Sequence, residues 1–174
     1  PTGSQTLQGM VGARWKPLTD QNLVLEIDKL FQLGGAARDD TLLRAAYSYS
    51  VGTDLRAIDT HWPTWYVYAE VDRFLEKAQL IGLMEGRFGH SFRLDPISSN
   101  LVFFPHAVIA ASYDDSYAKP EAYSIGAGGS LRYWFNETKY QAPPSYLELT
   151  LQYRFRLAGD KRAEGIFAQT SLNY

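Results

Sequence analysis

The stretch SYLELTLQYRFRL, residues 145–157, alternates between apolar and polar side chains along its whole length. Leu147, Leu149 and Leu151 are at odd-numbered positions, whereas Glu148 and Arg154 are at even-numbered positions, that is, on the other parity. Because a β-strand sends successive side chains to opposite faces, the stretch predicts a strand with one apolar and one charged face. It is longer than the about 5–6 residues of an ordinary strand and long enough for a transmembrane β-strand, which needs about 9–11.

The same alternation recurs along the rest of the chain, where turn-forming residues separate the segments. The eight other segments are 8–16, 22–31, 43–51, 65–72, 84–94, 101–113, 123–136 and 166–174. Consecutive strands joined by turns predict an all-β, antiparallel up-and-down meander that forms a β-barrel of about 8–10 strands. One alternative concerns 71–80, because Val71, Phe74, Leu75 and Ala78 also have helical spacing.

Composition narrows the class of protein. The 174 residues suit one domain, 1–174, and the net charge of −2 indicates no attraction to nucleic acid. The chain has no cysteine, which excludes disulfides, and it contains no run of about 18 apolar residues that would form a transmembrane helix. The first residues lack the features of a signal peptide. This is compatible with a processed product, but it favours the C-terminal fragment of a longer protein.

The central question is which face of the strands points outward. A soluble barrel fills its interior with apolar side chains, whereas a membrane barrel turns them toward lipid and keeps polar groups inside. Strand length, aromatic residues near strand ends and the terminal aromatic Tyr174 favour a membrane barrel. The aromatic set comprises Trp15, Phe31, Trp65, Trp134, Phe135, Phe155 and Tyr174.

This interpretation assigns a side to each residue of the alternating pattern. The predicted lumen-lining residues are Arg14, Glu26, Asp28, Arg44, Glu70, Asp72, Glu85, Arg87, Arg132, Glu148, Arg154 and Arg156. The predicted lipid-facing residues are Leu147, Leu149, Leu151, Tyr153, Phe155 and Tyr174. The alternative is a soluble β-barrel that binds a small apolar ligand and whose charges are solvated.

The number of strands raises a further question. Bacterial single-chain barrels have an even number of strands, and the pattern gives nine. Either one strand is miscounted or further strands complete a larger barrel.

The interior has two possible roles. Tyr66, Tyr68, Tyr146 and Trp134, together with the charged residues, would suit a saccharide path, since sugars stack on aromatic faces and bind charged groups. Alternatively, the charges pair across strands and plug a small barrel.

No catalytic, cofactor or metal site emerges from the sequence. His61, His90 and His106 are far apart in the chain, and for His106 we expect an inward, hydrogen-bonded structural role. His90 and Ser91 raise the alternative of an outer-membrane lipid esterase, but neighbouring strand residues point to opposite faces and do not pair directly. The glycines of 126–129 predict a bend or close strand packing. We therefore predict a protein that is not an enzyme.

Several segments resemble a known family. They are GARWKPLTDQNLVLEIDKLF (12–31), LLRAAYSYSVGTDLR (42–56), the region of Trp62 and Trp65, LVFFPHAVIAA (101–111) and LRYWFNETKYQAPPSYLELTLQYRF (131–155). Together, and in the same order along the chain, these segments resemble the C-terminal domain of the NfrA family. Members of this family are the outer-membrane adsorption proteins A for phage N-four.

The resemblance implies a porin-like barrel in the outer membrane of a Gram-negative bacterium. It also implies that a periplasmic helical-repeat region of the tetratricopeptide type lies upstream in a longer protein. The family is associated with exopolysaccharide export and serves as a phage receptor, so the implied partners are outer-membrane lipid, polysaccharide and a phage tail protein. No catalytic residues are carried over from the family.

Overall fold

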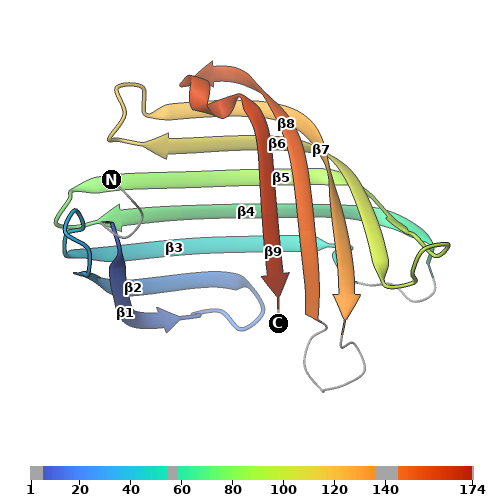
Figure 1. Ribbon diagram of the computed structural model, residues 1–174, viewed down its shortest axis with the longest axis horizontal. Helices are drawn as coiled ribbons and strands as arrows, with labels where there is room; N and C mark the ends of the chain where they lie inside the picture. Colours follow the sequence, from blue (N-terminus) through green and yellow to red (C-terminus); the bar gives the residue numbers. More distant parts are fainter. Residues whose placement is uncertain (1–5, 55–58, 136–144, 174) are drawn as a thin grey trace. The chain divides into compact units, whose positions relative to one another are not determined.

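The computed structural model describes residues 6–54, 59–135 and 145–173, so the expectation for Tyr174 lies outside the described residues. Their strands form one antiparallel sheet whose order is the order of the sequence, β1 to β9 (Figure 1). The strands are β1 (Gln8–Trp15), β2 (Asn22–Gln32), β3 (Asp40–Val51), β4 (His61–Phe74), β5 (Gln79–Arg93), β6 (Leu101–Asp114), β7 (Glu121–Phe135), β8 (Ser145–Gly159) and β9 (Gly165–Asn173). The predicted all-β meander and its nine strands are confirmed, whereas closure into a barrel stays a prediction because the order ends at β1 and β9.

The helical alternative for 71–80 is wrong. Strand β4 continues to Phe74, a turn follows, and β5 begins at Gln79. The carboxylate of Asp40 accepts the backbone N–H groups of Glu76 and Lys77, at 3.0 and 3.2 Å, and thereby holds the turn. Among the described residues the one helix is the single turn η1 (Lys161–Ala163), and none is long and apolar enough to cross a membrane.

Contacts divide the chain into two compact units. Unit 1 comprises Pro1–Tyr49, Tyr68–Met84 and Ala111–Glu121, and unit 2 comprises Ser50–Val67, Glu85–Ala110 and Ala122–Tyr174. Each long central strand therefore contributes residues to both units.

In unit 2, the register of β8 with its neighbours keeps like side chains on the same face. Leu149 lies opposite Leu131 of β7 and Thr170 of β9, while Glu148 lies opposite Arg132 and Ser171. The apolar and the polar faces of β8 thus continue across the adjoining strands.

The exposure of these two faces is the reverse of that in a water-soluble barrel. Leu149, Leu151 and Phe155 are 49%, 59% and 58% exposed, whereas Gln152 and Arg154 are only 2% and 9% exposed. The polar side of β8 is therefore the packed side, and its apolar side is open.

Close approach of β7 and β8 depends on glycine. A Cβ atom at Gly126 would lie 2.0 Å from the carbonyl oxygen of Tyr153, and one at Gly128 would lie 2.5 Å from that of Leu151. Strand β7 runs without a break through both positions. Close strand packing is thus the role of these glycines.

A small apolar core lies at one end of the packed side of unit 2. It consists of Trp62, Val102 and Trp134, with Tyr146 packed against it, and the indole N–H of Trp62 donates to the carbonyl of Gly52 at 2.7 Å. Trp134 shares the parity of Arg132 and is 4% exposed, so of its two predicted positions the aromatic belt is wrong and the inward side is correct.

Candidate functional site

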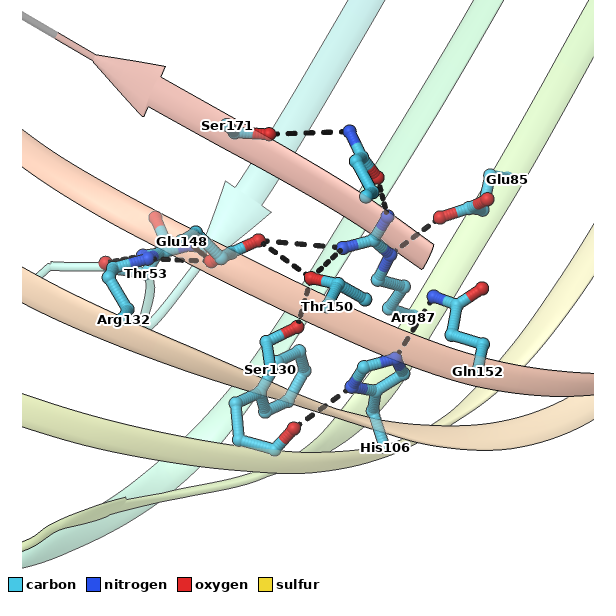
Figure 2. A network of polar contacts seen from close by, with 12 residues as sticks. Thr53, Glu85, Arg87, His106, Ser130, Arg132, Glu148, Thr150, Gln152 and Ser171 are labelled. Atoms are coloured by element: carbon cyan, nitrogen blue, oxygen red, sulfur yellow. Dashed lines mark hydrogen bonds and ion pairs between the residues drawn. The ribbon is translucent and has the colours of Figure 1, made fainter. Parts of the chain in front are cut away.

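The packed side of unit 2 holds a network of polar side chains, part of which Figure 2 shows. Its charged members are three arginines and two glutamates, namely Arg87, Arg132, Arg154, Glu85 and Glu148. They come from β5, β7 and β8, and within each strand they occupy positions whose side chains point to the packed face.

Arg87 is the centre of this network. Its guanidinium donates to Glu85 at 2.5 Å and to Gln169 at 2.7 Å, and it lies 3.5 Å from a carboxylate oxygen of Glu148. A further bond reaches Thr150 at 3.4 Å. Its side chain is 9% exposed, so these bonds replace most of its hydration.

Arg132 and Glu148 form the second part of the network. The Arg132 guanidinium contacts one Glu148 oxygen through two nitrogens, at 2.7 and 2.5 Å, and donates to the carbonyl of Thr53. Its carbon also lies 4.5 Å from the centre of the Tyr146 ring, within the range of a cation–π contact. This arginine therefore joins the network to the aromatic core.

The third part of the network runs from Glu85 to His106. Arg154 donates to Glu85 and, at 2.9 Å, to the side-chain oxygen of Gln152, whose amide nitrogen lies 3.1 Å from His106 Nε2. The other ring nitrogen of His106 lies 3.0 Å from the carbonyl oxygen of Phe104. His106 is 5% exposed and bonded on both sides, as the sequence predicts.

The sheet is curved within unit 2. Strands β5 and β9 are separated by three other strands in the sheet order, yet Arg87 of β5 bonds to Gln169 of β9. The polar face of unit 2 is therefore its concave side, and little space remains in it. A hollow of about 160 Å³ is lined by Tyr66, Arg87 and Gln169 among others.

Unit 1 carries a second, more open polar cluster. Arg44 binds Asp72 through two nitrogens, at 2.8 and 2.9 Å, and lies 3.5 Å from Glu70 and 3.6 Å from Glu26. Glu26 is also 3.1 Å from Arg14. A hollow of about 440 Å³ adjoins these side chains.

The structure thus brings ten of the twelve predicted lumen-lining residues into two charge-paired groups, one in each unit. The two others lie apart. Asp28 is buried beside Gly12, and its carboxylate makes no hydrogen bond or ion pair within the described part of the chain, while Arg156 is exposed near the end of β8. Of the predicted lipid-facing residues, the five that are described are all exposed, by 38% to 59%.

The geometry separates the residues of the esterase alternative. Ser91 is 3% exposed and its hydroxyl lies 2.7 Å from that of Thr64. His90 instead lies on the opposite parity, where its Nε2 is 2.9 Å from Nδ1 of His61. The described residues contain no group of three or more potential metal ligands.

Charge alone does not reveal the whole network. Ser130, Thr150, Gln152 and Gln169 are members that carry no charge. Each of them lies on the polar side of its own strand's alternation, and that position is the signal that identifies them. The pairing of His61 with His90 has no such signal, because it depends on the relative register of β4 and β5.

Comparison with known proteins gives one result. A family model described as "Bacteriophage N adsorption protein A C-term" matches residues 1–170. The curated proteins and the solved structures give no match.

Proposed function

This chain belongs to the bacteriophage N adsorption protein A C-terminal family, and on that premise we propose that it is the outer-membrane β-barrel module of a phage receptor. The module is not an enzyme and lies in the lipid of a bacterial outer membrane. It forms the C-terminal part of a longer protein whose upstream periplasmic region consists of helical repeats. The full-length protein takes part in exopolysaccharide export.

The observation that carries this proposal is the reversed burial of β8. Exposed Leu149, Leu151 and Phe155 alternate with buried Gln152 and Arg154 along a single strand. Exposure of apolar surface to water costs about 25 cal/mol of free energy per Å², whereas contact with lipid carries no such cost. A soluble barrel requires the opposite arrangement, with the leucines packed inside.

The filled interior favours the receptor role for unit 2 itself. Its network leaves a hollow of about 160 Å³, below the about 300–1,000 Å³ of typical ligand sites. Unit 2 therefore acts as a plugged scaffold that displays loops. Any saccharide path runs past the wider polar cluster of unit 1 or through other parts of the full-length protein.

Lipid contact is testable with two neighbouring positions. Because the chain has no cysteine, Leu149→Cys and Thr150→Cys each place one fluorophore on opposite faces of β8. After reconstitution into vesicles that contain brominated lipid, we expect strong quenching at position 149 and little at position 150. Equal quenching, or a protein that stays monodisperse without detergent, would contradict the membrane assignment.

Receptor activity is tested separately. The test uses a phage whose adsorption requires the full-length protein. We expect nanodiscs that contain the chain to lower the titre of free phage, and empty nanodiscs to leave the titre unchanged. An unchanged titre with a correctly inserted chain would refute the receptor role and leave the membrane assignment intact.

A further inference from the structure

A second hollow in unit 1 lies where the β2–β3 loop meets the β4–β5 turn. It has a volume of about 580 Å³ and is lined by residues of both connections, including Arg38, Asp39, Asp40, Glu76 and Lys77. Figure 1 shows these two connections at the same end of their strands. The volume falls within the range of small-molecule sites.

The carboxylates of this hollow are engaged by the protein itself. Asp39 accepts the backbone N–H of Gln32 at 2.6 Å, and Asp40 accepts two N–H groups of the β4–β5 turn. Glu76 binds the Lys29 ammonium at 2.9 Å and accepts from the backbone and the hydroxyl of Thr41, at 2.5 and 3.0 Å. The negative charges therefore serve to fix the loop and the turn.

The two cations that line the hollow are not engaged in this way. Arg38 accepts a bond from Gln8 through its backbone carbonyl, and Lys77 donates through its backbone N–H, but their charged groups have no partner among the described residues. The charged groups of the hollow that have no described partner are thus the two cations, and both belong to exposed residues. The uncharged part of its lining is mixed, with Thr6 and Gln8 as well as apolar residues that include Leu30 and Phe74.

We propose that this hollow binds a small anionic group, a carboxylate or a phosphate carried on a body with an apolar face. Arg38 and Lys77 bind the anion through charge-assisted hydrogen bonds, and Phe74 with Leu30 contacts the body of the ligand. An acidic sugar residue and a phosphorylated one share this chemistry. The site lies within unit 1, so the proposal does not depend on whether the apolar strand faces meet lipid.

The test uses the purified full chain in detergent and calorimetric titration. The probes are a disaccharide with one hexuronic acid, the corresponding neutral disaccharide and inorganic phosphate. We expect the acidic disaccharide or phosphate to bind, with an affinity that falls as salt is added, and the neutral disaccharide not to bind. Binding of the uronate alone identifies a carboxylate ligand, and binding of phosphate alone identifies a phosphate ligand.

Variants assign the binding to this hollow. Arg38→Gln and Lys77→Gln should each weaken binding at least about tenfold, as expected for loss of one charge-assisted bond. The control is Lys161→Gln, because Lys161 is exposed in η1 and does not line the hollow. Both test variants should unfold at the same denaturant concentration as the parent chain, since the replaced charged groups make no described contact. Unchanged affinity in both variants, equal binding of the neutral disaccharide, or no binding of any anion would overturn the proposal.

Discussion

At the scale of single residues, Arg87 gives the sharpest prediction. Arg87→Leu leaves Glu85 and Glu148, whose side chains are 13% and 11% exposed, without their central cation. Removal of one partner from a buried ion pair costs about 3–5 kcal/mol, so we expect a loss of this size in the free energy of unfolding. Denaturant titration in detergent measures it. The control is Arg156→Leu at an exposed position, which should change the free energy of unfolding by no more than about 0.5 kcal/mol. An equally small change for Arg87→Leu would mean that water fills the interior.

Leu149 tests the opposite face of the same sheet. An arginine on the lipid face costs about 2–4 kcal/mol at the bilayer midplane and about 0–1 near the interface. We therefore expect a large loss of stability for Leu149→Arg in lipid and a small loss for Leu157→Arg, which lies nearer the end of β8. Equal, negligible effects in lipid vesicles would argue that this face is in water.

Residue parity was informative because it follows directly from strand geometry. It predicted that Glu148 and Arg154 share a face, and the structure brings both into one network through Arg87 and Glu85. It did not predict that Gln152 is the partner of His106, because this contact depends on register and sheet curvature. For Trp134 the two sequence signals disagree: nearness to a strand end suggests exposure, whereas its parity predicts the inward position that the structure shows.

At the scale of elements, the turn between β4 and β5 predicts a dependence on pH. The hydrogen bond from Lys29 is the largest cause that holds the pKa of Glu76 below its ordinary value. The carboxylate therefore stabilises the fold above the ordinary glutamate pKa of about 4.3, and this stability is lost as the pH falls below that value. We expect Glu76→Gln to flatten the decline of the denaturation midpoint on acidification, whereas Glu164→Gln should leave the decline as it is.

The β7–β8 contact predicts the effect of added volume. Gly126→Val places a side chain against the backbone of Tyr153 and Arg154, which has no flexible atom to move aside. Overpacking of this kind costs about 1–3 kcal/mol in the free energy of unfolding. The matched change Ala127→Val points to the exposed face and should cost little. Thermal or denaturant unfolding of the two variants under the same conditions compares them directly.

Elements were the level most accessible from sequence. Nine alternating segments became nine strands, because a period of two over many residues matches the geometry of a strand and not that of a helix. The ambiguous segment 71–80 was decided by a distant residue, since the Asp40 carboxylate caps the turn in place of a helix. Helical spacing over a few residues carries no information about such a contact.

At the scale of the whole molecule, the odd number of strands leads to a prediction about closure. Because neighbouring strands alternate in direction, the first and the ninth strand, β1 and β9, run in the same direction. If this chain closed a barrel by itself, β1 and β9 would therefore have to pair as parallel strands. Bacterial barrels close with even numbers, and we therefore expect strands from outside 1–174 to complete the barrel.

Paired cysteines test this expectation. The register pair Leu149→Cys and Thr170→Cys should form a disulfide readily on oxidation, because β8 and β9 are hydrogen-bonded neighbours. The pair Val11→Cys and Ala168→Cys on β1 and β9 should not form one within a monomer. Efficient cross-linking of the second pair would show that nine strands close by themselves.

The bond between Arg87 and Gln169 has a consequence for the order of folding. The two residues are 82 positions apart, and Arg154 also stacks over the Phe167 ring of β9 at 4.3 Å. Until β9 docks, two arginines lack part of their final environment, and contacts of such long sequence separation form late and slowly. We therefore expect the polar interior of unit 2 to reach its low-energy state only after β9 has paired with β8.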